Sequence, residues 1–257
     1  MGIHPTAIVD PRATIHAEAE IGPYVVVEGP VKIGRGTRVM AHAHITGWTE
    51  IGEQNEIHTG AALGGAPQDS SYQGSESYLT IGSHNIFREY VQVHRGTKPV
   101  SSTEIGNHNF LMAGAHVGHN CRLGDRIVIA NGALLAGYVE VGDQAFISGN
   151  CVVHQFVRVG KLSLMRGLSG ASRDVPPYAI VDWQHQVRGV NVIGLKRAGF
   201  DELRIRAIKA AFRILFRGGR NLSLAIKELE SGGNVTADIA FLLEFIRSSK
   251  RGVCFGA

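Results

Sequence analysis

The 257-residue sequence has little of what marks several large classes of protein. Its three cysteines, Cys121, Cys151 and Cys254, form no even set and have no metal-ligand spacing, so neither a disulfide framework nor a zinc motif is indicated. No stretch approaches 18 apolar residues, so no transmembrane helix is expected. The net charge is only +4 and the basic residues are dispersed, which argues against nucleic acid as a partner.

A secretory leader is also missing from the sequence pattern. The first ten residues, MGIHPTAIVD, contain neither a charged n-region nor an apolar h-region. The cysteines are typical of buried or free thiols in a reducing compartment. Together these features favour a cytoplasmic location.

What the sequence does have is an apolar residue at every sixth position. Of the 28 positions from 3 to 165 that are six apart, 25 carry a large apolar residue, and only Asp69, Ser75 and Pro99 do not. A composition of 44% hydrophobic residues would fill about 12 of these positions by chance. A period of six is neither helical nor simple strand alternation, and it indicates a hexapeptide-repeat β-solenoid.

Three hexads predict one triangular coil of 18 residues, with the periodic residue pointing inward. Residues 18 apart then lie one above the other, about 4.8 Å apart. Hexapeptide solenoids resemble one another in being left-handed, so a left-handed parallel β-helix is expected. Glycine often follows the periodic residue, and it suits corners because it accepts a positive φ.

Two segments leave the repeat, residues 64–80 and 94–104, and the repeat returns in register after each, at Ile81 and Ile105. Long excursions from a compact scaffold are usually functional loops or disordered segments. Function is favoured here because Pro67, Gln68 and Asp69 are not typical linker residues.

The repeat ends after Met165, and Pro176-Pro177 is expected to stop the strand ladder. Residues 1–189 are therefore expected to form the β-helix and residues 190–257 a small helical C-terminal domain that caps its open end. Apolar positions predict a helix from Leu203 to Leu215 that ends at Gly218-Gly219. Two further helices are expected, one over about 222–231 and one from Thr236, as its N-cap, to about Ser248.

Stacking at a period of 18 brings polar groups from successive coils together. One column contains His119, Gly137 and Gln155. The flanking columns contain Asn120, Tyr138 and Phe156 on one side and Gly118, Ala136 and His154 on the other.

This column suggests acyl transfer. Imidazole is the side chain best suited to accept a proton near neutral pH, and the bare N–H of a glycine can stabilise an oxyanion. His119 and Gly137, one coil apart, would suit attack of a hydroxyl on a carbonyl. The alternative is that these histidines only form hydrogen bonds between coils or subunits. For His154, positioning or binding is expected rather than catalysis.

Metal binding is the main rival use of histidine on such a scaffold. Hexapeptide-class zinc carbonic anhydrases use histidines five residues apart together with one from a neighbouring subunit. Here His116 and His119 are three apart, and no well-placed cysteine or carboxylate completes a tetrahedral set. Neither a metal nor another cofactor is expected.

Several longer motifs are spread over essentially the whole chain. They are GGAPQD, FREYV, HRGT, AHVGHN, LAGYV, VVHQF, DVPPY and GVNVIGLKRAGF. In this order they resemble the UDP-N-acetylglucosamine O-acyltransferase family, which begins lipid A synthesis.

The resemblance implies transfer of an (R)-3-hydroxyacyl group from acyl carrier protein to the glucosamine 3-position of UDP-N-acetylglucosamine. It implies a homotrimer with active sites between subunits, His119 as general base and the Gly137 N–H as oxyanion donor. Asp69 would contact the sugar and Gln68 the acyl-chain hydroxyl. The further substrate contacts implied are His116, Tyr138, His154, Gln155, Asn191 and Arg197, with Met165 and Gly167 where acyl-chain length is limited.

This chain departs from the family pattern at several positions. Asn120 follows the catalytic histidine where an aspartate is common, which removes a carboxylate that could orient the imidazolium. The other departures are Tyr138 for the usual histidine, Ser70, Ser71 and Tyr72 where a lysine is often found, and Ile193 and Ala198 for a glutamate and a second arginine. They leave the reaction type intact and leave open a 3-amino sugar acceptor, which would give an amide.

Acyl carrier proteins are acidic, and basic residues gather near the end of the repeat. They are Arg158, Lys161, Arg166, Arg173 and Arg188. Charge complementarity would steer such a partner, and a generic solvated basic face is the alternative.

Three other readings are weaker. The sister enzyme that N-acylates the next intermediate normally carries an extra N-terminal domain, and a coenzyme A-dependent acetyltransferase is another enzyme alternative. A non-catalytic scaffold predicts regular ladders of like residues, whereas the unusual residues here gather around 116–155 and in the two loops.

Overall fold

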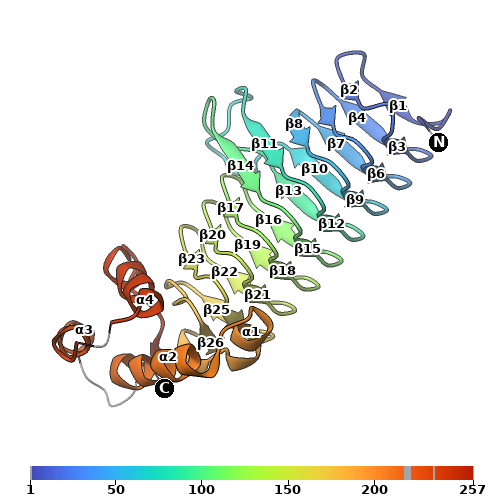
Figure 1. The fold of residues 1–257 in the computed structure, drawn as a ribbon. Helices are drawn as coiled ribbons and strands as arrows, with labels where there is room; N and C mark the ends of the chain where they lie inside the picture. Colours follow the sequence, from blue (N-terminus) through green and yellow to red (C-terminus); the bar gives the residue numbers. More distant parts are fainter. Residues whose placement is uncertain (1, 217–220, 234, 257) are drawn as a thin grey trace.

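The apolar repeat folds into stacked triangular coils, with a group of helices at the C-terminal end (Figure 1). The structure is a computed structural model, and it describes residues 2–216, 221–233 and 235–256. Each coil contributes one short strand to each of three sheets, and neighbouring coils pair in parallel. The expected fold, a left-handed parallel β-helix followed by helices, is confirmed.

Over the described residues, the first sheet is formed by the strands that precede the corner at which His119 lies. They are β1 (Ile8–Val9), β4 (Val26–Glu28), β7 (His44–Thr46), β10 (Ala62–Gly65), β13 (Gln92–His94), β16 (His116–Val117), β19 (Leu134–Leu135), β22 (Val152–Val153) and β25 (Gly170–Ala171). The second sheet follows that corner. Its strands are β2 (Thr14–Ile15), β5 (Lys32–Ile33), β8 (Trp48–Ile51), β11 (Tyr78–Ile81), β14 (Ser102–Ile105), β17 (Arg122–Leu123), β20 (Glu140–Val141) and β23 (Arg158–Val159).

The third sheet continues past the coils into the C-terminal region. Its strands in the described residues are β3 (Glu20–Ile21), β6 (Arg38–Val39), β9 (Glu56–Ile57), β12 (Ile86–Phe87), β15 (Phe110–Leu111), β18 (Val128–Ile129), β21 (Phe146–Ile147), β24 (Leu164–Met165), β26 (Ala179–Asp182), β27 (Gln186–Val190) and β28 (Phe255–Gly256). β27 runs antiparallel to β26, and β28 pairs with β27.

The core is the column of periodic residues. Ile57, Leu63 and Leu111 are fully buried, whereas Ile3 in the first turn is half exposed because no coil covers it on that side. Burial of each such side chain contributes about 1.5–3 kcal/mol. Apolar burial along the whole column therefore holds the coils in register.

The two excursions lengthen two coils without shifting the register. Ile51 pairs with Ile81, 30 residues on, and Ile81 pairs with Ile105, 24 residues on, in place of the usual 18. The extra residues form loops at 66–77, between β10 and β11, and at 95–101, between β13 and β14. Both loops leave the solenoid on the same side, next to the corner between the first and second sheets (Figure 1).

The expectation that the recurrent glycines adopt a positive φ was wrong for most of them. Of the glycines that follow a periodic residue, Gly64 has a positive φ, but those such as Gly34 and Gly52 do not. A Cβ at Gly34 would lie 2.5 Å from the carbonyl oxygen of Gly52 in the next coil. Glycine recurs there because the coils approach each other closely. The left-handed backbone conformation occurs two residues later in the turn, at non-glycine residues such as Gln54 and Tyr138.

The proline pair does not end the sheet. Val175 still bridges to Val159, and β26, directly after Pro176-Pro177, adds to β24. The expected stop was therefore too early, because β26, β27 and β28 of the third sheet all follow the prolines. The prolines lie at the turn between two strands, where they need not donate to a ladder.

The helices are α1 (Val192–Arg197), α2 (Glu202–Phe216), α3 (Leu222–Ser231) and α4 (Ala237–Arg247). α1 was not anticipated, and the expected stop at Gly218-Gly219 lies outside the described residues. Leu203 is 73% exposed and is not part of the buried stripe of α2. Thr236 caps α4 as expected, its hydroxyl accepting from the N–H of Ile239. No helix within the described ranges is long and apolar enough to cross a membrane.

Candidate active site

The corner after β16 stacks His119 on the equivalent corners of the next two coils. The N–H of Tyr138 donates to the carbonyl of His119 (2.9 Å), and the N–H of Phe156 donates to the carbonyl of Gly137 (3.2 Å). The ring of Tyr138 packs edge-on against His119, with centroids 5.3 Å apart, and stacks on Phe156. The columns predicted from the 18-residue period are therefore present.

Gly137 lies directly beneath the imidazole of His119. A Cβ built at residue 137 would lie 2.5 Å from both Cε1 and Nε2 of the ring. Ala17, Ala41 and Ala113 occupy the same position of equivalent turns, so the turn itself accepts a side chain. Glycine at 137 is thus required by the histidine ring, and among the described residues no carbonyl or side chain accepts from its N–H.

The Nδ1 side of His119 is enclosed by two oxygens. Oγ1 of Thr97 lies 2.5 Å and Oδ1 of Asn120 lies 3.0 Å from Nδ1. The Asn120 oxygen also accepts from the N–H of Thr97 (3.0 Å), which identifies it as the carbonyl end of the amide. His119 is 7% exposed, so its ring has little freedom to turn.

The opposite nitrogen of His119 faces the first excursion loop. Oδ2 of Asp69 lies 3.5 Å from Nε2. The N–H and hydroxyl of Ser71 both donate to Asp69 at 2.8 Å, and these hydrogen bonds, with a smaller contribution from His119, lower the pKa of the Asp69 carboxyl. The carboxylate is therefore ionised next to the histidine.

Asp69, His119 and Gly137 face one open cavity of about 410 Å³ between the first loop and the stacked corners. It is lined by Gln68, Asp69, Ser70, His94, His116, Gly118, His119, Ala136, Gly137 and Gln155. The structure thus brings together six of the residues singled out in the sequence. They are Gln68, Asp69, His116, His119, Gly137 and Gln155.

Two other histidines of the cavity are held neutral. Burial, together with neighbouring His94, lowers the pKa of His116 to about 4. Burial also lowers the pKa of His94, whose Nδ1 donates to the carbonyl of Ala66 (2.7 Å). Nε2 of His94 is left as a buried acceptor without a donor among the described residues. Among the described residues, no three histidine, cysteine, aspartate or glutamate side chains lie close enough together to hold a metal ion.

The remaining predicted residues lie outside this cavity. His154 is exposed and close to Arg251 (3.4 Å), and Tyr138 lines the neighbouring groove with Asn120. The other predicted residues lie towards the C-terminal end of the coils, where Asn191 caps α1, Arg197 is exposed in its last turn, Met165 is fully buried in the core and Gly167 is exposed.

Thr97 and His94 of this site were not singled out from the sequence. Both lie within the HRGT tract, at the start of the second excursion. The excursion adds six residues, so the 18-residue map does not show which coil its side chains reach. The return of the repeat at Ile105 shows only that the loop rejoins the coil in register.

Models of known families match two parts of the chain. The second domain of UDP-N-acetylglucosamine O-acyltransferase matches residues 174–254, and the bacterial transferase hexapeptide repeat matches residues 102–137. Among curated proteins, an acyl-[acyl-carrier-protein]–UDP-N-acetylglucosamine O-acyltransferase of Syntrophobacter fumaroxidans is 47% identical over 98% of this chain and 99% of its own. One of the same name from Thermodesulfovibrio yellowstonii is 43% identical over 98% of each chain.

A solved structure agrees in shape over nearly the whole length. The UDP-N-acetylglucosamine acyltransferase of Francisella novicida is 35% identical, with a TM-score of 0.94 over 98% of this chain and 94% of its own. The helical region, the coils and both excursions are thus shared with proteins of that name. With this cavity, this fold and these identities over almost its full length, the chain belongs to the UDP-N-acetylglucosamine O-acyltransferase family.

Proposed function

We propose that the protein transfers an (R)-3-hydroxyacyl group from acyl carrier protein to the 3-hydroxyl of UDP-N-acetylglucosamine, the first step of lipid A synthesis. The observation that carries the proposal is the arrangement of Nε2 of His119 next to the free N–H of Gly137 in one cavity. A base and an oxyanion donor on adjacent coils are what attack of a hydroxyl on a thioester requires. The names of the relatives state both substrates.

In this mechanism His119 acts first as a general base and then as a general acid, and it transfers one proton. Nε2 takes the proton of the sugar 3-hydroxyl as its oxygen attacks the thioester carbonyl. The tetrahedral oxyanion accepts a hydrogen bond from the N–H of Gly137. When the intermediate collapses, the C–S bond breaks, and the imidazolium returns the proton to the departing thiolate.

The other residues of the cavity are proposed to hold the substrates. Asp69 lies close enough to His119 to accept a hydrogen bond from a sugar hydroxyl that also meets Nε2. Gln68, on the same loop, is proposed to contact the hydroxyl of the acyl chain, and His116 and Gln155 the sugar. With His116 neutral, the Asp69 carboxylate dominates the charge of the cavity.

Residues further along the coils extend the proposed site. We propose that Tyr138, His154, Asn191 and Arg197 meet the sugar nucleotide, with part of this surface completed by a neighbouring subunit. Gly167 is proposed to limit the acyl chain. A methyl group there would meet only the carbonyl of Gly149 at 3.5 Å within its own chain.

A homotrimer is proposed from the outer face of the third sheet. From β12 onward its outward side chains pair as a half-buried apolar ladder, whereas the outward residues of the second sheet, such as Glu104, Arg122 and Glu140, are charged. The ladder is Ile86, Phe110, Val128, Phe146 and Leu164. Light scattering is expected to give three times the chain mass of 27.6 kDa, and a monomer for Phe110→Asp. A monomeric wild type would contradict the trimer.

The basic residues first assigned to acyl carrier protein all contact their own chain. Arg158 pairs with Asp174 (2.9 Å), while Arg166 (3.0 Å) and Arg188 (3.7 Å) both reach Asp182. The other two lie over aromatic rings, Lys161 on Phe241 and Arg173 on Phe255. Two carboxylates, Asp174 and Asp182, therefore compensate part of this charge within the molecule.

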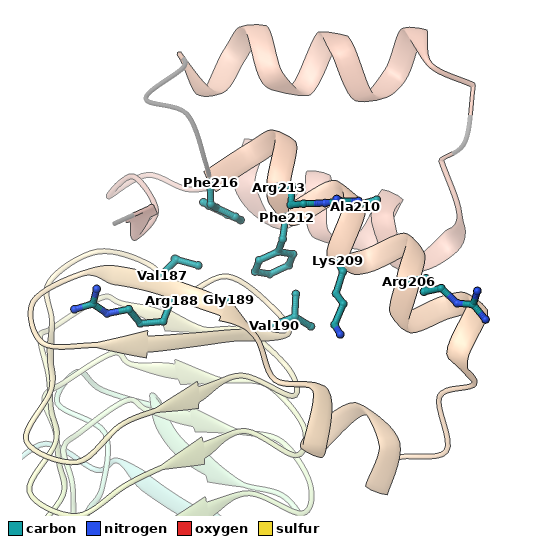
Figure 2. A pocket seen from close by; sticks show the side chains of 10 residues that line it. All are labelled: Val187, Arg188, Gly189, Val190, Arg206, Lys209, Ala210, Phe212, Arg213 and Phe216. Carbon is teal, nitrogen blue, oxygen red and sulfur yellow. The ribbon is translucent and has the colours of Figure 1, made fainter.

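A second basic surface is better suited to an acidic carrier protein. A groove of about 860 Å³ lies between β27 and α2, where Phe212 and Lys209 reach from the helix toward the strand (Figure 2). Among the described residues its lining includes no acidic side chain. Its basic residues are Lys209 and Arg213, together with Arg188 and Arg206, which pair with Asp182 (3.7 Å) and Glu202 (3.3 Å). We propose that acyl carrier protein docks here, by charge complementarity over an apolar floor.

A reducing compartment, the cytoplasm, is the proposed location. The three cysteines are buried and unpaired, and burial raises the pKa of Cys121 and Cys254 to about 12. Such thiols are protonated and are not prepared for disulfide exchange.

The proposal is tested with purified protein and a panel of substrates. UDP-N-acetylglucosamine and its 3-amino analogue are each incubated with 3-hydroxyacyl carrier proteins of graded length, and products are identified by mass spectrometry. The expected product is the 3-O-ester. If only the 3-amino analogue is acylated, giving an amide, the acceptor is the amino sugar and not UDP-N-acetylglucosamine. If no combination of acceptor and donor gives a product, the proposed function is refuted.

A further inference from the structure

Thr97 reaches His119 from outside the stacked coils. It lies in the 95–101 loop, and its side chain is buried, with 6% exposed. Its hydroxyl oxygen lies 2.5 Å from Nδ1 of His119, while its backbone N–H donates to Oδ1 of Asn120. The hydroxyl and the N–H of this residue therefore act on the histidine or on its immediate neighbour.

The turn that carries Thr97 is fixed to the scaffold on both sides. The N–H of Gly96 donates to the carbonyl of Tyr78 (3.1 Å), and the N–H of Val100 donates to the carbonyl of Glu76 (2.9 Å). Because β11 and the end of the first loop anchor it, the hydroxyl is held in place before any substrate binds.

The contacts of Nδ1 determine where the ring carries its proton. Oδ1 of Asn120 accepts the N–H of Thr97, so this atom is a carbonyl oxygen and cannot donate to the ring. Two oxygens at 2.5 and 3.0 Å from Nδ1 are satisfied when Nδ1 carries the hydrogen. In the neutral ring Nε2 then has the free lone pair, and it faces Gly137 and Asp69.

We propose that Thr97 is a positioning residue of the reaction. With Asn120 it supplies two uncharged oxygens to Nδ1, which fixes the tautomer and the plane of the ring without a carboxylate at that nitrogen. The inference rests on the proposed function, because it assigns Nε2 of His119 as the base. The ionisable groups that act on the ring are Asp69 of the first loop and His94 of β13.

Thr97→Val tests the proposal, since it removes the hydroxyl and keeps the shape. Loss of a hydrogen bond to a group that becomes charged should lower kcat by about 10–100-fold with KM for the sugar nucleotide unchanged. The acid limb of the kcat/KM profile should move to lower pH, because the imidazolium loses an acceptor. Thr97→Ser should restore most of kcat, and Asn120→Asp should move the acid limb to higher pH.

A matched control separates positioning from stability. Thr37→Val removes a buried hydroxyl several coils away, where it donates to the carbonyl of Gly52 (2.8 Å), and should leave kcat and the pH profile unchanged. Melting temperature and mass are measured for every variant. Wild-type kcat with an unmoved pH profile in Thr97→Val overturns the proposal, as does an equal loss in Thr97→Ser.

A spectroscopic readout keeps this test separate from the proposed function. Ring ¹⁵N chemical shifts of His119, assigned by comparison with His119→Ala, report the tautomer without any substrate. The Nδ1–H tautomer is expected in the wild type, with loss of its dominance in Thr97→Val. An Nε2–H ring in the wild type overturns the role of Thr97, whereas absent acyl transfer with an Nδ1–H ring contradicts only the proposed function.

Discussion

Gly137→Ala should impair catalysis through the position of His119 rather than through the fold. The added methyl carbon would lie 2.5 Å from Nε2 and Cε1, and ordinary contact begins at 3.4 Å, so the ring must move by roughly 1 Å. A shift of this size stretches the hydrogen bonds of Nδ1 and moves Nε2 away from the attacking hydroxyl.

Misplacement by about 1 Å costs on the order of 10²-fold in rate, or about 2.7 kcal/mol in the activation free energy. We expect kcat to fall by this amount, with KM for the sugar nucleotide little changed, in a steady-state assay with acyl carrier protein donor. The change in melting temperature should be small, because Ala17 and Ala113 stand at the same turn position in other coils.

Gly149→Ala is the matched control. Residue 149 occupies the same position of its turn, but a methyl group there would come no closer than 3.4 Å to any neighbour, the carbonyl oxygen of Asn131. This variant should have wild-type kcat. If Gly137→Ala is as active as Gly149→Ala, the close contact between His119 and residue 137 does not govern the reaction.

Three further predictions concern the end of the solenoid and the charge of the site. Asp174→Ala should lower the free energy of unfolding by about 3 kcal/mol in urea titration, because it leaves the partly buried guanidinium of Arg158 without its carboxylate; an unchanged midpoint would contradict the structural role of this pair. The folded pKa of His116, about 4, lies below its unfolded value of 6.5, so the unfolded chain binds more protons between these values and stability should fall as pH drops through this range. Between pH 7 and pH 5 the melting temperature of His116→Gln should fall by less than that of the wild type. An equal fall would show that His116 does not contribute to the pH dependence of stability. Lys209→Glu should raise KM for acyl carrier protein with kcat kept, and added salt should narrow the difference; an unchanged KM would remove the groove from the docking surface.

The coils were predictable because one physical requirement recurs at every sixth residue. Each periodic position needs an apolar side chain, and the same period fixes which residues stack, so the column of His119, Gly137 and Gln155 followed directly from the sequence.

The loops were not predictable in this way. Asp69 and Thr97 reach His119 from segments without periodicity. Loop composition and the family resemblance pointed to Asp69, but no role was expected for Thr97. The role of the recurrent glycines was also misjudged, because the close approach of a second coil depends on the packing of the two and cannot be read from a single hexad.

The end of the solenoid was predicted in part. The helices of the tail follow from their apolar stripes and caps, such as Thr236 before α4. The antiparallel return of β27 and the pairing of β28 with it depend on contacts between distant segments. Charge near the end was likewise misjudged, since Arg158 and Arg166 are neutralised by acids that lie 16 residues away in the sequence.

His119 is proposed to take the proton of the acceptor hydroxyl, and the turnover of His119→Ala is the decisive measurement of this role. With saturating UDP-N-acetylglucosamine and 3-hydroxyacyl carrier protein, we expect kcat to fall by about 10²–10⁴-fold, with the melting temperature and the mass of the assembly unchanged. A variant that turns over at a rate close to that of the wild type would show that His119 is not the base.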